Sequence, residues 1–363
     1  MNNLLIQTES KVRFKMCGTN CKIDCIKIQQ SKREHQEAYF TEHQSNIKKT
    51  WEGLGNLVNV KKSVRFSISQ LNVNGKIVDD PAMIADKLNK FFVNVGPETE
   101  KKVPKVPHAS PQKYLKNRNQ FDLIIAHISE EEVLNIINSL PNKSSGPTSI
   151  PLRLLVDVAD LVITPLCHII NLPFRTGIFP DILKISKVVA IHKGGSTQEL
   201  NNFRLISLLS IFDKIIEKLM HKRIYEFFED HNILYELQFG FRKKMSTAHS
   251  LVEITEEIKE SIDNGKFGCG IFIDLKKAFD TVNHQILLTK LEHYGIRDTL
   301  LKWFESYLTD RKQYVYHNGI ASSMESITCG VPQGSVLGPL LFLIYVNDLP
   351  NISDKLVKVF SFC

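Results

Sequence analysis

The stretch that decides the fold is Phe272-Ile273-Asp274-Leu275-Lys276-Lys277-Ala278-Phe279-Asp280. The apolar run over 270–273 predicts a buried strand that ends at Asp274, and a helix-like segment follows it. A strand end offers a carboxylate a rigid backbone beside an open cleft, so Asp274 is a candidate catalytic residue. Asp274 could instead cap the following helix, because Asp is common at helix starts. We interpret Asp280 as a residue that orients the turn or pairs with a neighbouring lysine.

A second informative segment is Gly330-Val331-Pro332-Gln333-Gly334-Ser335, a polar glycine turn that opens an apolar run. That run, over 337–346, is broken by Gly338-Pro339 and is too short to cross a bilayer. We therefore expect no membrane role for the chain.

The composition is that of a globular protein with a moderate basic excess. The chain has 363 residues and a net charge of +7, with short Lys and Arg clusters along it. A basic balance favours polyanionic partners, although single clusters are also typical of a solvated surface.

The seven cysteines and the absence of an N-terminal apolar run favour a reduced compartment. Cys17, Cys21 and Cys25 are evenly spaced, but no nearby Cys or His completes a usual zinc pattern. Zinc binding and incidental cysteines both remain open for this trio.

Strands that alternate with helices predict an α/β or α+β core; we expect an α+β fold with four regions. Residues 1–34 are expected to be a poorly ordered leader, 35–100 a mostly helical region, and 101–124 a Lys- and Pro-rich linker. Residues 125–363 form the main domain.

Local signals place several elements within these regions. Asp80-Pro81 opens a helix that Gly96 closes, and Ser129 with Glu132 is a capping box ahead of another helix. A strand is expected over 183–192, an amphipathic helix over 211–228, and a hairpin over 313–328 that turns at Asn318-Gly319.

Five blocks of the chain, in this order, resemble the motif series of non-LTR retrotransposon reverse transcriptases, especially the Jockey-like elements. The blocks are Lys143-Ser144-Ser145-Gly146-Pro147; residues 187–195 with Asn202-Phe203-Arg204; residues 238–242 with Ser246-Thr247; the Asp274 block; and the Gly330 block with the apolar run after it. Together they cover roughly 140–363. The region 35–100 also looks like the segment that joins endonuclease and polymerase in such elements.

The resemblance implies a right-hand polymerase, with fingers and a partial palm formed by a mixed sheet and packed helices. It implies RNA-directed DNA polymerase activity, with an RNA template, a DNA primer and deoxynucleoside triphosphates as partners. Two Mg²⁺ ions would assist nucleotidyl transfer, and Asp274 would be the first metal ligand. The family also implies a cytoplasmic and nuclear location.

Further roles carry over to matching positions. Phe279 corresponds to the steric gate against a 2′-hydroxyl, although its spacing also suits core packing. Gln333 and Gly334 match the turn beside the incoming nucleotide and template, and a turn without a ligand is the alternative. Lys187 and Arg204 match the positions that meet the triphosphate, but Lys193 could replace Lys187 in that role.

Arg242, Lys243 and Lys244 match the block that contacts nucleic acid, where Phe239 and Phe241 are read as core residues rather than as stacking platforms. Two departures from the family pattern are Thr148-Ser149 after the Gly146-Pro147 turn, and Leu205 in place of a proline after Arg204.

The last residues, 359–363, correspond to the approach to the family's Phe-Ala-Asp-Asp strand, so we expect a C-terminally truncated palm without the thumb. One carboxylate cannot neutralise two divalent ions. The sequence therefore leaves two readings: a reverse transcriptase domain, or a catalytically inactive element remnant that at most binds RNA or DNA. Oligomeric state is not indicated.

Overall fold

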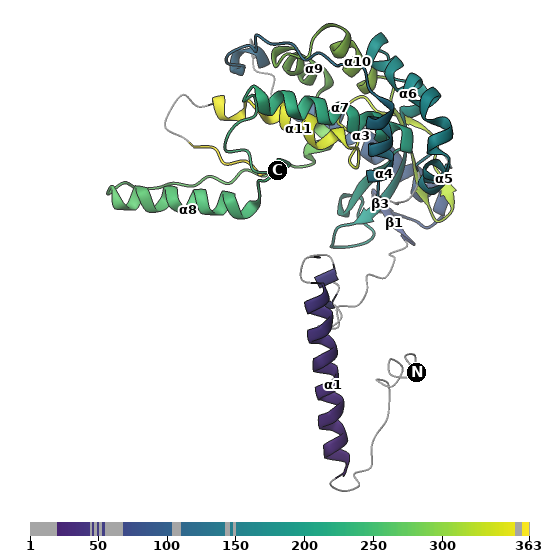
Figure 1. Cartoon of the computed structure of the whole chain (residues 1–363), viewed down its shortest axis with the longest axis vertical. Coiled ribbons are helices and arrows are strands. Elements are labelled where there is room, and N and C mark those ends of the chain that lie inside the picture. Colours follow the sequence, from purple (N-terminus) through teal and green to yellow (C-terminus); the bar gives the residue numbers. More distant parts are fainter. Residues whose placement is uncertain are drawn as a thin grey trace. The chain divides into compact units, whose positions relative to one another are not determined.

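The computed structural model describes residues 20–43, 46, 49–50, 53–54, 68–103, 110–141, 146–147, 150–352 and 358–362 (Figure 1). The chain divides into two compact units, Met1–Phe66 and Ser67–Cys363. Predictions for Lys143-Ser144-Ser145, Thr148-Ser149 and Cys363 lie outside the described residues.

The first unit contains helix α1, Asn20–Glu42. The helix begins inside the segment 1–34, where the sequence analysis expects a poorly ordered leader. No Gly or Pro interrupts 20–42, and its many Lys, Glu and Gln residues favour helix. Cys17 lies outside the described residues, and the side chains of Cys21 and Cys25 are not described, so the zinc hypothesis stays open.

The second unit is built on a mixed five-stranded sheet, which agrees with an α+β fold. Its strands are β3 (Ile185–His192), β4 (Phe203–Leu208), β5 (Lys312–His317), β6 (Ile320–Ala321) and β7 (Glu325–Ser326). The order is β4-β3-β5-β6, with β7 also pairing with β5. β3 and β4 are antiparallel, whereas β3 and β5 run parallel. A separate hairpin joins β1 (Leu71–Val73) to β2 (Lys76–Val78).

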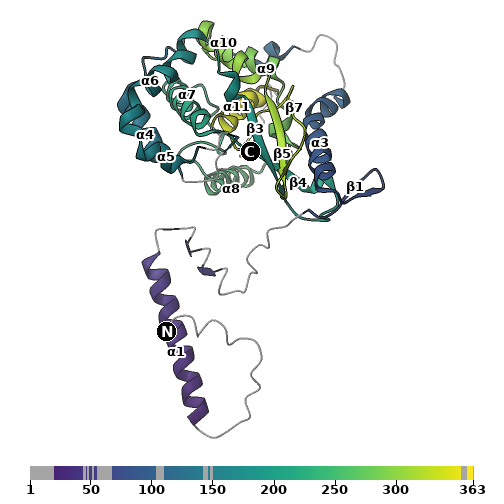
Figure 2. The same cartoon turned by 90° about the vertical axis from the view of Figure 1, so that its right-hand side faces the viewer.

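Helix α3 (Pro81–Lys102) covers one face of this sheet. Figure 2 shows α3 beside the strands of this sheet. The side chains packed between α3 and the sheet are apolar and buried: Ile84, Leu88 and Phe92 from the helix, with Val188, Phe203, Leu205 and Val315 from the strands. Asn89 on α3 fixes the register, because its side chain bonds to the backbone and side chain of Gln313.

The helix therefore belongs to the same compact unit as the strands, although the sequence analysis assigns them to separate regions, 35–100 and 125–363. Amphipathic periodicity reveals that α3 has an apolar face but not which surface receives it. The expected linker 101–124 is also docked in its described part. Asn119 N–H donates to His293 O over 3.1 Å, and Leu123 N–H donates to Gly295 O over 2.9 Å.

The remaining helices form a second, larger apolar core. They are α4 (Glu130–Ser139), α5 (Leu152–Asp157), α6 (Ala159–Thr176), α7 (Ile211–Asp230), α9 (His284–His293), α10 (Asp298–Leu308) and α11 (Leu337–Val346), with short 3₁₀ turns at Pro111–Tyr114, Asp181–Leu183, Leu200–Asn202, Ala278–Thr281 and Leu349–Ile352. Trp303 lies at the centre of this core, stacked on Phe174 and Tyr307. Helix α8 (Thr247–Asp263) is mostly exposed, with Ser250 as its buried residue.

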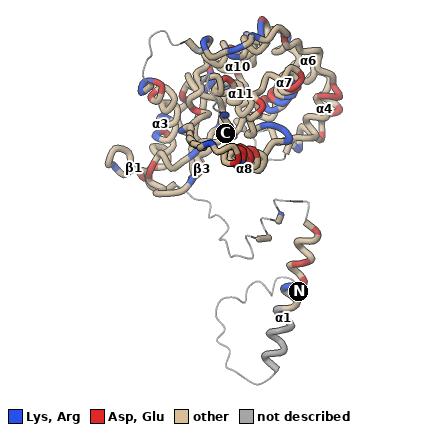
Figure 3. Tube along the Cα trace, turned by 90° about the vertical axis from the view of Figure 1, so that its left-hand side faces the viewer, with Lys and Arg blue, Asp and Glu red and all other residues tan. Residues whose placement is uncertain are grey.

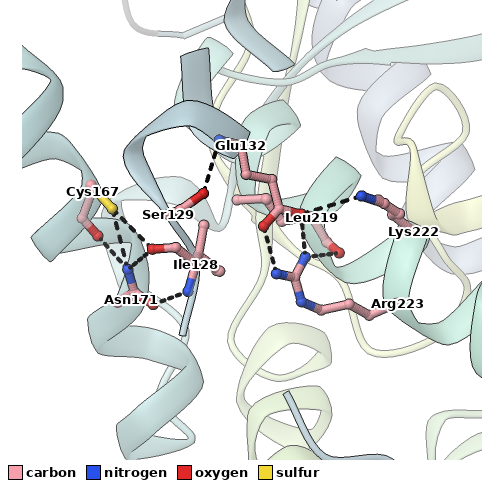
Figure 4. Close-up of polar contacts among 8 residues, drawn as sticks. All are labelled: Ile128, Ser129, Glu132, Cys167, Asn171, Leu219, Lys222 and Arg223. Atoms are coloured by element: carbon pink, nitrogen blue, oxygen red, sulfur yellow. Dashed lines mark hydrogen bonds and ion pairs between the residues drawn. The ribbon is translucent and has the colours of Figure 1, made fainter. Parts of the chain in front are cut away.

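Side-chain hydrogen bonds fix the entry to α4 (Figure 4). Ser129 Oγ accepts from Glu132 N–H, as the capping box predicts. The Glu132 carboxylate does not return to the cap, and instead pairs with both terminal nitrogens of Arg223 on α7 at 2.8 Å. Asn171 on α6 bonds to both the N–H and the carbonyl of Ile128, which ties the segment just before α4 to α6.

Other local predictions are confirmed. Asp80 accepts from Met83 N–H at the start of α3, although this helix continues past Gly96 to Lys102. The hairpin turns at Asn318-Gly319, and both residues have positive φ, at 48° and 86°. Among the described helices, none is long and apolar enough to cross a membrane.

Candidate active site

The face of the sheet opposite α3 carries the predicted triphosphate-contacting cations. Side chains alternate along a strand, and directly paired residues share a face. Val188, Phe203 and Leu205 face α3. Their neighbours along the strands, Lys187 and Arg204, therefore point to the opposite face. Arg204 is exposed, and Lys187 lies with its Nζ 3.8 Å from the centre of the Tyr316 ring. Lys193, the alternative to Lys187, is exposed in the loop between β3 and β4.

The Gly330–Ser335 turn lies against the outer edge of β4. Ser207 N–H donates to Gln333 O over 2.7 Å, which joins the turn to the strand that carries Arg204. Gly334 has φ 119°, and a Cβ there would stand 2.7 Å from Ser207 O. Both the backbone conformation and this close approach require glycine. The structure therefore brings Gln333 and Gly334 to β4.

Phe279 joins the other side of the same turn. Val331 N–H donates to Phe279 O over 2.8 Å, and Gly330 N–H donates to Val282 O over 2.8 Å. The Phe279 ring stacks on Phe342 with centroids 5.2 Å apart and meets Phe241 edge-on at 5.9 Å. Since the ring is only partly buried, these contacts fit core packing and leave part of it accessible to a ligand.

Asp274 does not end a buried strand, and this expectation is wrong. Residues 268–275 have no regular secondary structure, and no described strand pairs with them. Ile271, Phe272 and Ile273 are 82%, 90% and 76% exposed. A strand depends on a neighbour for its backbone hydrogen bonds and for burial of its side chains. Apolar content alone therefore cannot make this segment a strand.

The described residues do not assemble a site for two metal ions. Asp274 is exposed and offers one carboxylate, and no group of three or more His, Cys, Asp or Glu among the described residues could hold a metal ion. Magnesium accepts several waters, so one carboxylate can contribute to its shell. The described donor set nevertheless does not fit a two-ion centre.

The basic block 242–244 is split between the interior and the surface. Arg242 is 12% exposed in its side chain and forms a bidentate pair with Glu229, with N–O distances of 3.0 Å. Lys243 and Lys244 are exposed, and Lys243 Nζ lies 4.9 Å from the Tyr225 ring. Helix α8, which follows this block, is strongly acidic (Figure 3). Of the two aromatics, Phe239 is buried as expected for a core residue, whereas Phe241 is half exposed.

Two charged groups beside the turn have shifted pKa values. Burial raises the pKa of the Asp280 carboxyl, and the nearby Lys277 ammonium partly opposes this shift. Burial also lowers the pKa of Lys277. The Lys277 ammonium lies 3.4 Å from Asn201 Oδ1, just ahead of β4, and over the Phe91 ring of α3. Pairing of Asp280 with a neighbouring lysine stays a prediction.

The end of the described chain returns to the segment before α8. Ser361 forms a parallel bridge with Gln238, and Phe239 N–H donates to Ser361 O over 2.7 Å. The residues predicted to approach the family's acidic strand therefore lie beside the 238–242 block.

A buried polar cluster behind the turn was missed by the sequence analysis. Asp213 and Glu217 on α7 lie one helical turn apart and are fully buried with Arg311 and Tyr307. Glu217 accepts hydrogen bonds from the Tyr307 hydroxyl at 2.5 Å and from Val336 N–H at 2.6 Å. Burial raises the pKa of both carboxyls. The only signal in the sequence is that both acids fall on the apolar face of an otherwise amphipathic helix.

Two cavities lie elsewhere. One, of about 590 Å³, is lined by residues of α4 and α7 that include Glu132, Lys222 and Arg223. Another, of about 760 Å³, includes Arg242 and Tyr294. We place the candidate site at the edge of β4 and not at these cavities. Arg204, Gln333 and Gly334, which the sequence predicts to contact the nucleotide, come together there.

The match to known families agrees with this geometry. Residues 191–362 match the family model described as "Reverse transcriptase (RNA-dependent DNA polymerase)", which includes β4, Asp274, Phe279 and the 330–335 turn. These residues belong to the reverse transcriptase family. This match and the mobile-element relatives described next together confirm the motif-based prediction of a non-LTR retrotransposon reverse transcriptase.

Similar proteins come from mobile elements of Drosophila melanogaster. The chain is 35% identical over 239 residues (64% of this chain, 26% of the relative) to "Probable RNA-directed DNA polymerase from transposon BS". It is 32% identical over 242 residues (66% and 26%) to "RNA-directed DNA polymerase from mobile element jockey". It is also 32% identical over 248 residues (66% and 26%) to "Probable RNA-directed DNA polymerase from transposon X-element". The chain thus matches about a quarter of the length of each of these relatives.

Proposed function

We propose that the chain supplies the nucleotide-contacting part of an RNA-directed DNA polymerase, with the β3–β5 sheet as fingers and the Phe279 and 330–335 segments as palm. The observation that carries the proposal is the hydrogen bond between Ser207 N–H and Gln333 O. It holds the predicted nucleotide turn against the strand that carries Arg204. The names of the relatives support the reaction class.

Each side chain then has a physical role. The Arg204 guanidinium, together with Lys187 or Lys193, would offset the negative charge of a triphosphate on the open face of the sheet. Gly334 carries no side chain, which lets the turn lie directly against Ser207 on β4. The accessible part of the Phe279 ring would limit the space beside the sugar.

Asp274 is proposed as a magnesium ligand. When bound, magnesium supplies charge neutralisation at the transferring phosphate. The described carboxylates do not fit a two-ion centre. The proposed partners are an RNA template, a DNA primer and deoxynucleoside triphosphates, and the proposed location is cytoplasmic and nuclear, as in the family.

The test is binding of an RNA–DNA template–primer by the purified chain, with and without the matched deoxynucleotide. We expect Arg204→Met to remove most of the gain in affinity that the nucleotide provides. Arg153→Met, which removes an exposed cation from α5, is the matched control and should bind like the unmodified chain. Equal nucleotide effects in both variants would argue against the proposed site.

A primer-extension assay with Mg²⁺ separates the two readings of activity. Extension that Asp274→Ala abolishes would assign polymerase activity to this chain. Binding without extension would show that these residues bind nucleic acid and do not polymerise by themselves, and we expect this second outcome because Asp274 offers one carboxylate.

A further inference from the structure

Glu217 connects the interior of the helical core to the candidate site. It lies on α7, which begins three residues after β4 ends, and its side chain is fully buried. One carboxylate oxygen accepts from the Tyr307 hydroxyl on α10 at 2.5 Å, and the other accepts from Val336 N–H at 2.6 Å. Val336 directly follows the Gly330–Ser335 turn.

The turn is consequently anchored on both sides of Gly334. On one side, Gln333 O accepts from Ser207 N–H on β4. On the other side, Glu217 holds Val336 N–H, and Ser335 Oγ accepts from Gly338 N–H at 2.8 Å. If the Val336 anchor were lost, Ser335 Oγ would still accept from Gly338 N–H and the apolar packing of α11 would remain, but the turn would lose its hydrogen bond to α7.

The charge environment explains why an acidic residue suits this position. The first N–H groups of a helix lack partners within the helix and carry partial positive charge, so they favour a carboxylate. Arg311 lies on the far side of the cluster, with a nitrogen 3.9 Å from Asp213. Two buried acids share this one guanidinium, so the cluster is most stable with a proton bound to one of the acids.

We propose that Glu217 is a positioning residue, which sets the placement of the Gln333–Gly334 turn against β4 through its hydrogen bond to Val336 N–H. This inference rests on the proposed function, in which the Gln333–Gly334 turn contacts the nucleotide. The hydrogen bond itself can be tested without any activity.

The central experiment compares Glu217→Gln with Glu217→Met in the full chain by hydrogen exchange of the peptide over 331–338. Gln keeps an oxygen for Val336 N–H and an amide for the Tyr307 hydroxyl, whereas Met has a similar length and no acceptor. We expect exchange in this peptide to be about tenfold faster in the Met variant, and close to the original rate in the Gln variant. Glu226→Met, an exposed position on the same helix, should leave it unchanged.

The second readout is the affinity for an RNA–DNA template–primer with the matched deoxynucleotide. We expect the Met variant to lose the nucleotide-dependent gain and the Gln variant to recover it. If the unmodified chain shows no such gain, the proposed function fails, while the exchange data still decide whether Glu217 positions the turn. Equal exchange over 331–338 in the folded Met and Gln variants would overturn the inference.

Val336→Pro removes the same hydrogen bond from the other end, in case the Met variant does not fold. Val336 has φ −78°, which suits proline at a helix start. We expect this variant to match the loss of nucleotide-dependent affinity predicted for Glu217→Met. Full retention of that affinity would also overturn the inference.

Discussion

Replacing Gly334 by alanine tests whether the backbone of the turn lies in close contact with β4. The new Cβ would lie 2.7 Å from Ser207 O and 3.3 Å from the Ile206 side chain, at a backbone φ of 119°. The obstacle is a backbone oxygen, which cannot rotate away as a flexible side chain could.

Two costs add up in this variant. A non-glycine residue at such a φ costs about 1–3 kcal/mol. Moving the turn away from Ser207 weakens the hydrogen bond to Gln333 O, which costs about 0.5–1.5 kcal/mol more. A total of roughly 2–4 kcal/mol corresponds to a fall in Tm of about 4–10 °C for a large domain.

Gly194→Ala separates the two costs. Gly194 has φ 123° in the loop between β3 and β4, but nothing lies within 4 Å of its added Cβ. It should therefore suffer only the backbone cost. Thermal unfolding followed by circular dichroism measures both variants. An equal fall in Tm for the two substitutions would refute the close approach of the turn to β4.

Three further predictions concern charged groups. Arg223→Met removes the bidentate pair with Glu132 and should lower the unfolding free energy by about 1–3 kcal/mol in urea titrations; an unchanged midpoint would contradict the pairing. Burial, and after it the neighbouring Glu217 carboxylate, raises the folded-state pKa of Asp213 well above its usual 3.8. The stability that protonated Asp213 contributes is therefore full below pH 3.8 and is lost as the pH rises through the folded-state pKa. Asp213→Asn should therefore show a smaller loss of Tm between pH 4 and neutrality, and an identical pH profile would count against this burial. Lys244→Met should weaken binding to an RNA–DNA duplex and reduce the slope of log affinity against log salt concentration by about one, with an unchanged Tm. Arg242→Met should lower Tm, because its side chain is mostly buried in the ion pair with Glu229. The reverse pattern would show that Arg242 faces the nucleic acid.

Local signals in the sequence predicted local structure well. The starts of α3 and α4 follow from Asp80 and Ser129, whose side chains accept the first free N–H groups. The hairpin turn follows from Asn318-Gly319, because few other residue pairs take positive φ together. These features depend on a few adjacent residues, and such information is present in any window of the sequence.

Features that depend on distant partners were not predictable in the same way. The apolar run over 270–273 reads as a strand, but a strand exists only where another strand meets it. Asp213 and Glu217 fall on the apolar face of α7, but the sequence does not show that Tyr307, Arg311 and Val336 are the groups that enclose them. The pairing of Arg242 with Glu229 could be seen only once the fold was known, and contact of Arg242 with nucleic acid stays a prediction.

The contact between α3 and β5 has a consequence for how the chain reaches its native state. Asn89 bonds to Gln313, 224 residues later, and the parallel pair of β3 with β5 joins Ile185 to Lys312. During synthesis, the part of the α3 face that contacts Val315 on β5 must therefore wait until that strand has left the ribosome. Contacts of such long sequence separation form slowly, and the waiting surface is exposed to aggregation. We expect yield in the folded state to depend strongly on chaperones and on a slow rate of translation.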